Sequence, residues 1–363
     1  HASWDVWYLR SGIMGYRPVS IGFSRAHPED QRIIVSHADA EDRSDRIPGG
    51  VPGAEDPGSE APAHADVAER WLACATRMAA AGKAAAQPLQ GTAAGRVMLG
   101  KGAGGDRTME IDRACEAAMH EVLEAEAPAA YRLVSEESGV SGDAGAPWCV
   151  VVDPLDGSLN AKRGLEPYCA SIAIADQAGL GGVAVAYIED YARSRAFAAL
   201  RGRGLVDVGP APEAWLPEDL RPMALDVSRF TADPIEVVLL EAGRPDRHRF
   251  AYQDLAAMGA LGESRDMRLR QIGSLALSLC YVAVGVADIL VAAVRSRSVD
   301  IAAGLLILRE AGGDAAALGG WDIFQQPLDL EKRCAFVAWR AGLQRDEVIE
   351  RSHRLETLLV APE

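Results

Sequence analysis

The stretch VVVDPLDGS at residues 150–158 constrains this chain most, because two acids directly follow an apolar run. Three valines are typical of a buried strand, and a carboxylate at its end costs free energy unless a partner compensates the charge. Pro154 cannot continue a hydrogen-bonded ladder, so we expect the strand to end there and Asp153 and Asp156 to project from one turn. Two carboxylates that close repel each other, and Mg²⁺ is a suitable partner.

The residues after the second acid predict an anion site. Gly157 and Ser158 stand at the expected start of a helix, where backbone N–H groups are free to bind anions. A metal pair beside an anion site suits the hydrolysis of a phosphate ester. The sequence Asp-Pro-x-Asp-Gly also forms plain turns in many proteins, so this motif alone leaves that structural alternative open.

Further acids stand at the edges of other expected elements. Glu136 and Glu137 lie in SEESG after a short strand-like segment, and Asp112 lies on an expected helix over 108–123. Asp300 opens a helix in SVDIAAG, where the small residues allow another backbone to come close. Three such motifs in this order are hard to attribute to turns alone.

The combination of SEESG, DPLDGS and DIAAG resembles the inositol monophosphatase superfamily of Mg²⁺-dependent, lithium-sensitive phosphatases, which includes fructose-1,6-bisphosphatases. The resemblance extends from about Val67 to about Leu359. It implies a five-layer αβαβα sandwich of the sugar phosphatase type, within the α+β or α/β class. The resemblance also implies a homodimer.

The resemblance assigns the metal ligands position by position. It implies that Glu136, Asp153 and the carbonyl of Leu155 hold one Mg²⁺. Asp153, Asp156 and Asp300 would hold a second Mg²⁺.

The catalytic pair is also assigned by resemblance. Asp112 would pair with the hydroxyl of Ser158, where the family usually has Thr, and the two would orient and deprotonate the attacking water. The backbone amides of Gly157 and Ser158 would bind phosphate oxygens. Asp106 matches a loop that helps to hold a third, weaker metal, so we expect two or three Mg²⁺ ions in each site.

Substrate preference is predicted from the second half of the chain. Ala293 stands where animal-type inositol monophosphatases carry an acid for inositol hydroxyls. Arg295 and Arg297 instead resemble the archaeal-type branch that also acts on fructose-1,6-bisphosphate, and a guanidinium can bind a second phosphate in a bidentate manner. Two arginines in a loop are equally compatible with a solvated surface.

A second segment, RLRQIGSLALS, supplies further substrate candidates. Gly273 and Ser274 stand at a strand-to-helix turn that matches a family segment facing the substrate. Arg268 and Arg270 flank this turn and are weaker candidates.

Periodicity and composition divide the chain into three parts. Residues 1–66 are an acidic leader that we expect to be disordered, with ten acids against three arginines over 28–66. Residues 67–222 predict an α+β metal-binding domain with an antiparallel sheet, and residues 223–363 predict an α/β domain. Helices are expected over 67–85, 108–123, 249–261, 274–285, 300–313 and 343–359, and strands over 148–152, 168–175, 182–188, 195–200, 235–243, 287–294 and 334–340. The glycine-rich stretch 99–108 lacks the ending of a P-loop and is interpreted as a surface loop.

Charge and cysteine usage exclude several classes. A net charge of −15 argues against a nucleic-acid or anionic membrane partner. The six cysteines show no C-x-x-C spacing and are expected to be buried free thiols. No long uninterrupted apolar run and no signal-peptide pattern is found, so we expect a cytoplasmic protein without a membrane span.

The favoured function is therefore Mg²⁺-dependent hydrolysis of a sugar or polyol phosphomonoester, with fructose-1,6-bisphosphate or a similar sugar phosphate as substrate. Inositol-1-phosphate and a 3′-phosphonucleotide are alternative substrates. A catalytically silent regulatory relative is a further alternative, in which the acidic leader would bind a partner. The presence of all four side-chain ligands, Glu136, Asp153, Asp156 and Asp300, favours the enzyme.

Overall fold

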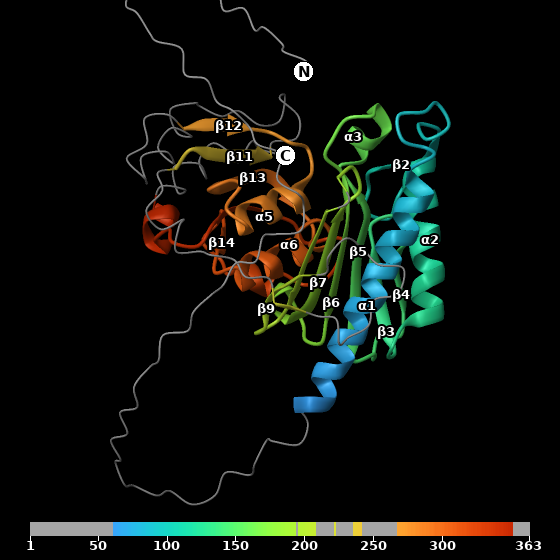
Figure 1. Cartoon of the computed structure of the whole chain (residues 1–363), viewed down its shortest axis with the longest axis horizontal. Helices are drawn as coiled ribbons and strands as arrows, with labels where there is room; N and C mark the ends of the chain where they lie inside the picture. Colours follow the sequence, from blue (N-terminus) through green and yellow to red (C-terminus); the bar gives the residue numbers. More distant parts are fainter. Residues whose placement is uncertain (1–60, 194, 208–220, 223–234, 242–266, 351–363) are drawn as a thin grey trace, which may run out of the picture. The chain divides into compact units, whose positions relative to one another are not determined.

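Helices cover both faces of a large sheet, and a smaller sheet forms the next layer, in the part of the chain that the structure describes (Figure 1). This computed structural model describes residues 61–193, 195–207, 221–222, 235–241 and 267–350. All of them belong to one compact unit, Asp56–Glu363. The expected leader lies outside the described residues up to residue 60, and its last residues, 61–66, are helical.

The helices and strands expected within the described residues are present at or near their predicted bounds, and the structure adds several short strands. The helices are α1 (Ala61–Ala86), α2 (Glu110–Glu126), α3 (Ser158–Arg163), α5 (Leu275–Ala283) and α6 (Ser298–Glu310), with 3-10 turns at Leu180–Gly182 and Ile323–Gln325. The larger sheet has the order β10-β9-β8-β7-β6-β5-β3-β4, with β3 (Tyr131–Ser135), β4 (Gly139–Gly142), β5 (Trp148–Asp156), β6 (Cys169–Ala175), β7 (Val183–Asp190), β8 (Arg195–Leu200), β9 (Gly204–Asp207) and β10 (Arg221–Pro222). The smaller sheet has the order β12-β11-β13-β15-β14, with β11 (Val237–Glu241), β12 (Arg268–Arg270), β13 (Ile289–Ser296), β14 (Asp314–Ala317) and β15 (Cys334–Trp339). A separate hairpin joins β1 (Met98–Lys101) and β2 (Arg107–Met109).

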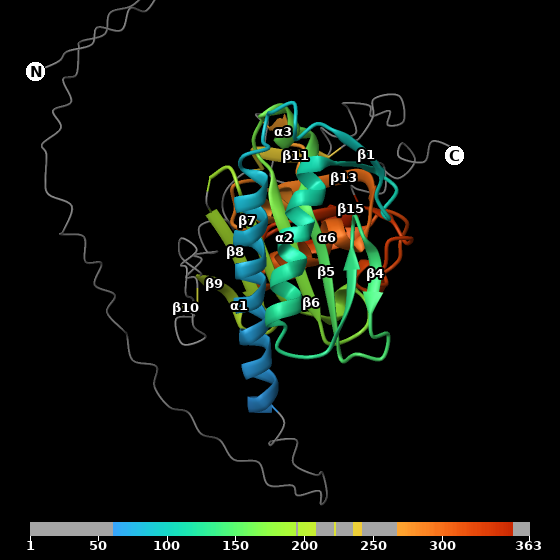
Figure 2. The same cartoon turned by 90° about the vertical axis from the view of Figure 1, so that its right-hand side faces the viewer.

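The larger sheet is buried on both faces. Every residue of β6 and β7 is buried, which requires cover on each side of the sheet. Helices α1 and α2 pack on one face, and α6 packs on the other together with α5 (Figures 1 and 2). The strands from β5 to β10 form the expected antiparallel meander, whereas β3 joins β5 in parallel.

The smaller sheet adds the fourth layer and the beginning of a fifth. Leu290 and Phe336 face the core shared with α5 and α6, while Val291 and Val337 face the opposite side. Val348 packs on that opposite side, within residues 345–350, which are helical. The described residues thus confirm the expected fold class and show the αβαβα order. The helix expected over 249–261 lies outside the described residues.

Pro154 does not end β5, contrary to our expectation. The strand continues to Asp156, and its register shifts between Asp153, opposite Ser171, and Asp156, opposite Cys169. An advance of three residues on β5 therefore corresponds to two residues on β6, so β5 carries one extra residue, which defines a β-bulge. Because residues two apart on a strand share a face, the extra residue brings both aspartates to the same face of the sheet.

The start of α6 packs closely against α5. A Cβ atom at Gly304 would lie 2.6 Å from Cδ1 of Leu279. The small residues after Asp300 thus allow the close approach that the sequence predicts, here between a helix backbone and a neighbouring side chain.

None of the helices in the described ranges is both long and apolar enough to cross a bilayer. The six cysteines are free thiols, as expected, and five of them are buried. The residues on either side of the expected domain boundary at 222 lie largely outside the described ranges, and that division stays a prediction.

Candidate metal and phosphate site

Three carboxylates from separate elements meet near the end of β5. Glu136 follows β3, Asp153 lies in β5, and Asp300 lies in the first turn of α6. One oxygen of each lies within 4.8 Å of the others. Carboxylate oxygens are the ligands that Mg²⁺ prefers, so the donor set fits the predicted metal.

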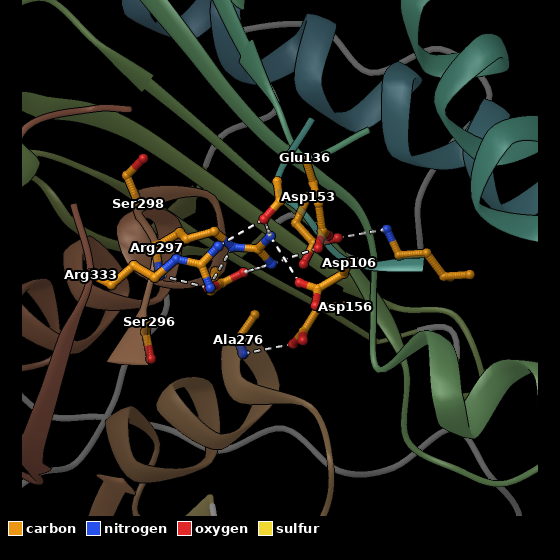
Figure 3. Close-up of polar contacts among 12 residues, drawn as sticks. Asp106, Glu136, Asp153, Asp156, Ala276, Ser296, Arg297, Ser298 and Arg333 are labelled. Atoms are coloured by element: carbon orange, nitrogen blue, oxygen red, sulfur yellow. Dashed lines mark hydrogen bonds and ion pairs between the residues drawn. The ribbon is translucent and has the colours of Figure 1, made fainter. Parts of the chain in front are cut away.

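Asp156 faces the same side and is held from the second half of the chain. Its Oδ2 accepts a hydrogen bond from the hydroxyl of Ser274 at 2.6 Å. The same oxygen accepts a second from the amide of Ala276 at 2.8 Å (Figure 3). Ser274 caps the N-terminus of α5. Both of these donors bind the same oxygen, which leaves the lone pairs of Oδ1 available for a cation.

Burial makes this cluster of acids difficult to ionise. It raises the pKa of Asp153 well above its usual range, with neighbouring carboxylates adding to the shift. Burial likewise raises the pKa of Glu136, and it raises that of Asp156 to about 7. The acids therefore need positive charge beside them in order to ionise together near neutral pH.

Arg297 supplies one positive charge inside the cluster. Its Nη2 lies 2.5 Å from Oε1 of Glu136 and 2.9 Å from Oδ1 of Asp300, and its Nη1 lies 3.0 Å from Oδ2 of Asp106 (Figure 3). The side chain is only 6% exposed. The N–H groups of Arg297 are directed to these carboxylates and to the carbonyl of Gly104, and its role in binding substrate phosphate stays a prediction.

The sequence contains a signal that places Arg297 beside Asp300. Arg297 and Asp300 are three residues apart at a helix start, a spacing at which side chains meet on one face. The same pair is also joined through the backbone, since the amide of Arg297 donates to Oδ2 of Asp300 at 2.7 Å.

The glycine-rich stretch lies beside the site as a hairpin rather than as a free surface loop. The carbonyl of Gly104 accepts from Nη1 of Arg297 at 3.1 Å and from Nη2 of Arg333 at 2.7 Å. The amide of Gly104 donates to the carbonyl of Glu136 at 2.8 Å. Asp106 follows this turn and is exposed, with its carboxylate on Arg297. A third metal at Asp106 stays a prediction.

Asp112 is a buried acid with one free oxygen. Its Oδ2 accepts the amide of Met109 at 2.8 Å, and its Oδ1 is buried without a hydrogen-bond partner. Burial raises its pKa to about 6. Ser158, the first residue of α3, is half-buried, and within the described residues no hydrogen bond joins it to Asp112. A buried acceptor without a partner is costly, and a water molecule at this oxygen would supply the missing donor.

Gly157 occupies a position that only glycine suits. Its φ is +84°, and a Cβ atom would lie 3.1 Å from the carbonyl oxygen of Pro167 and 3.2 Å from that of Gly273. The amide of Leu155 donates to Oδ1 of Asp153 at 3.0 Å. The metal-binding role of the Leu155 carbonyl and the phosphate-binding amides of Gly157 and Ser158 stay predictions.

The remaining substrate candidates come from the second half of the chain. Gly273 has a φ of +77° and lies against Asn160 of α3. Arg295 is exposed near the end of β13, and Arg268 and Arg270 are exposed on β12. Their roles in binding substrate are untested by this geometry.

Glu137 is an acid near the site to which we assigned no role. It accepts a hydrogen bond from the hydroxyl of Thr108 in β2, and burial raises its pKa to about 7. The only sequence feature that pointed to Glu137 as a site residue was its position directly after Glu136.

The fold and the acidic site define a family, and comparison with known proteins agrees. The profile of the inositol monophosphatase family matches residues 68–357. The chain therefore belongs to the inositol monophosphatase family and is a phosphoric monoester hydrolase.

Three relatives illustrate the similarity. The chain is 30% identical to the fructose-1,6-bisphosphatase/inositol-1-monophosphatase of Methanothermobacter thermautotrophicus over 279 residues, covering 74% of this chain and 91% of that protein. It is also 30% identical to the Nus factor SuhB of Xylella fastidiosa over 258 residues, covering 70% of this chain and 82% of the relative. The solved structure of the Thermotoga maritima IMPase shares the fold, with a TM-score of 0.59 at 22% identity over 80% of this chain and 99% of the other.

Proposed function

We propose that this protein is a Mg²⁺-dependent phosphatase that hydrolyses a sugar or polyol phosphomonoester by attack of water. The observation that carries this proposal is the meeting of Glu136, Asp153 and Asp300 beside Asp156. Together they form a set of oxygen ligands in which Asp153 is buried and the other three are half-buried. When bound, Mg²⁺ neutralises phosphate charge and lowers the pKa of water.

The ligand assignment follows the arrangement of the carboxylates. Glu136, Asp153 and the carbonyl of Leu155 would hold one ion, and Asp153, Asp156 and Asp300 would hold another. The shared Asp153 lies in the bulge of β5 on the same face as Asp156. Arg297 contacts Glu136 and Asp300 directly, so it shares these carboxylates with any bound ion.

The roles of the remaining site residues concern water and phosphate. Asp112 would orient the attacking water through its free Oδ1 and accept its proton, with the hydroxyl of Ser158 as the second contact. The amides of Gly157 and Ser158 would donate to phosphate oxygens as negative charge develops there.

The substrate we favour is fructose-1,6-bisphosphate or a similar sugar phosphate. A relative named for both fructose-1,6-bisphosphatase and inositol-1-monophosphatase activities supports this choice. Ala293 lacks the acid expected for inositol hydroxyls, and the exposed guanidinium of Arg295 is a candidate for a second phosphate. Inositol-1-phosphate and a 3′-phosphonucleotide remain the alternative substrates.

A regulatory role is the second candidate function, because several relatives are named Nus factor SuhB. The acidic cluster favours catalysis over a silent relative, since all four side-chain ligands are kept. A cytoplasmic location and a homodimer are part of this proposal. The location is expected from the sequence pattern, and the homodimer is implied by the family resemblance.

The proposal is tested by phosphate release from fructose-1,6-bisphosphate, inositol-1-phosphate and 3′-phosphoadenosine 5′-phosphate, with and without Mg²⁺. We expect release that requires Mg²⁺ and is lost in Asp300→Asn, while the exposed Glu331→Gln serves as the matched control. Full activity of Asp300→Asn would contradict the assignment. Arg295→Ala should impair bisphosphate hydrolysis more than monophosphate hydrolysis, and equal effects would remove the substrate preference.

A further inference from the structure

The turn before α5 is held in place by side chains on both sides. On one side, Oε1 of Glu241 accepts hydrogen bonds from the amides of Ile272 and Gly273, each at 3.2 Å. The same oxygen accepts the hydroxyl of Ser278 at 3.0 Å. Glu241 is the last residue of β11 and is 7% exposed. A carboxylate this buried needs such donors to offset its desolvation.

On the other side, the turn is tied to α3. The amide nitrogen Nδ2 of Asn160 donates to the carbonyl of Ile272 and to that of Pro167, each at 2.8 Å. Asn160 lies three residues after Gly157 in α3. The 272–274 turn is therefore also fixed relative to the amides of Gly157 and Ser158, which we expect to bind phosphate.

The turn delivers the donors that hold Asp156. It leads directly into Ser274 and Ala276, whose hydroxyl and amide both bind Oδ2 of Asp156. The hydroxyl oxygen of Ser278 also lies 2.8 Å from the carbonyl oxygen of Ser274, so its single proton is shared between Glu241 and Ser274 and links the two. Displacement of the turn would release Oδ2 and change the direction of Oδ1.

We propose that Glu241 is a positioning residue of the metal centre, which acts through the 272–274 turn and Ser274 to orient the carboxylate of Asp156 toward Mg²⁺. Glu241 itself makes no hydrogen bond with Asp156 in the described part of the chain. Hydrogen-bonding partners that orient a ligand typically contribute about 10–100-fold to metal affinity. This inference rests on the proposed function, because it concerns the cation at that site.

Titration calorimetry of Mg²⁺ into the full-length protein tests the proposal without relying on catalysis. Glu241→Ala should bind Mg²⁺ about 10–100-fold more weakly. Glu241→Asp retains the charge but retracts the carboxylate by one methylene, so it should show a similar loss. Glu241→Gln retains an acceptor oxygen at the same reach and should bind close to the wild type. Glu236→Ala removes an exposed acid just before β11 and is the matched control.

The dependence of activity on Mg²⁺ concentration distinguishes a positioning role from a general loss of structure. In the variants we expect the Mg²⁺ concentration for half-maximal activity to rise, while kcat at saturating Mg²⁺ recovers most of its value. Ser274→Ala combined with Glu241→Ala should be less than additive, because Glu241 acts through Ser274. If Glu241→Ala does not fold, Glu241→Asp and Ser278→Ala carry the same test.

If the wild type binds Mg²⁺ and releases phosphate, the proposed function stands, and two results would still overturn the positioning role of Glu241. The first is wild-type Mg²⁺ affinity in Glu241→Ala and Glu241→Asp. The second is a loss in Glu241→Gln as large as in Glu241→Ala, because charge rather than hydrogen bonding would then be responsible. If the wild type neither binds Mg²⁺ nor releases phosphate, the proposed function is refuted and this inference with it.

Discussion

Asp112 and Asp300 hold the same position in two helices that are distant in the sequence. Each is the third residue of its helix, and each accepts the amide of the capping residue through Oδ2, at 2.8 Å for Asp112 and 2.7 Å for Asp300. This contact is half of a capping box. It anchors one oxygen and directs the other to the site, and the N-terminal end of the helix favours the negative charge. A local helix rule thus places two carboxylates for which we propose functional roles.

Replacement of Asp112 by Asn should remove the base but keep the helix cap. We expect kcat to fall by about 10²–10⁴ with little change in Mg²⁺ affinity, because the amide oxygen still accepts from Met109. In the wild type, activity should also fall as the pH drops through about 6, where Asp112 becomes protonated. Steady-state kinetics over pH measures both effects. Ser158→Thr, which keeps the hydroxyl, is the control, and an unchanged kcat in Asp112→Asn would refute the role.

Arg297 shares carboxylates with the expected cation. Arg297→Met removes the guanidinium and keeps most of the apolar stem, so Glu136 and Asp300 lose their positive partner. We expect a lower melting temperature in chelator and a larger increase on adding Mg²⁺ than in the wild type. Scanning fluorimetry measures both. Arg333→Met, which loses a contact to the carbonyl of Gly104, is the matched control, and equal shifts in both variants would contradict this view.

At the scale of elements, a bulge in β5 brings Asp153 and Asp156 together, a role that the sequence analysis assigned to a turn. A proline in a strand indicates an interruption of the ladder, and that signal was present in the sequence. Whether the strand ends or continues depends on β6, which pairs with Asp153 and again with Asp156. The thiol of Cys115 on α2 supports the bulge from the opposite side, donating to the carbonyl of Pro154 at 3.0 Å. Both aspartates therefore lie on one face through a strand irregularity.

The contact between α5 and α6 predicts a cost for any side chain at Gly304. Gly304→Ala should lower the free energy of unfolding by about 1–3 kcal/mol through overpacking against Leu279. The better helix propensity of Ala offsets up to about 1 kcal/mol of this. Urea denaturation measures the change. The double variant with Leu279→Ala should be more stable than additivity predicts, and a fully stable Gly304→Ala would show that the packing has slack.

At the scale of the whole described unit, the site joins two halves of the chain. Asp153 comes from the larger sheet and Glu136 directly follows its strand β3. Asp300 comes from α6, Ser274 from the start of α5 and Glu241 from the smaller sheet. Cation binding should therefore stabilise the packing between these halves as well as the site itself.

Stability should depend on pH and on Mg²⁺ together. Burial raises the pKa of Asp156 to about 7 and that of Asp112 to about 6, from an ordinary value of 3.8. The stability contributed by these protons is complete below about pH 4 and is lost as the pH rises to about 7. Mg²⁺ bound at Asp156 would replace the proton of that carboxyl, so we expect Mg²⁺ to raise the melting temperature more at pH 8 than at pH 5. Equal effects of Mg²⁺ at both values would contradict this linkage.

Much of the site could be predicted from local sequence. The two aspartates around Pro154, the glycine at Gly157 and the acid at the start of α6 follow from strand, turn and helix rules that involve only neighbouring residues. Helix and strand positions were predicted well for the same reason, because periodicity is a local signal. The family resemblance added the order of the motifs, and the matching profile confirms it.

What could not be predicted depends on partners that are distant in the sequence. The shared face of Asp153 and Asp156 follows from the register of β5 against β6. The position of Arg297 among the carboxylates requires β3 and α6 to meet, and the support of Asp156 by Ser274 requires α5 to pack beside β5. Local propensities do not specify such meetings, because packing and pairing between remote segments bring these side chains together. The sequence by itself therefore identifies residues of the site, whereas their mutual contacts are decided only by the tertiary structure.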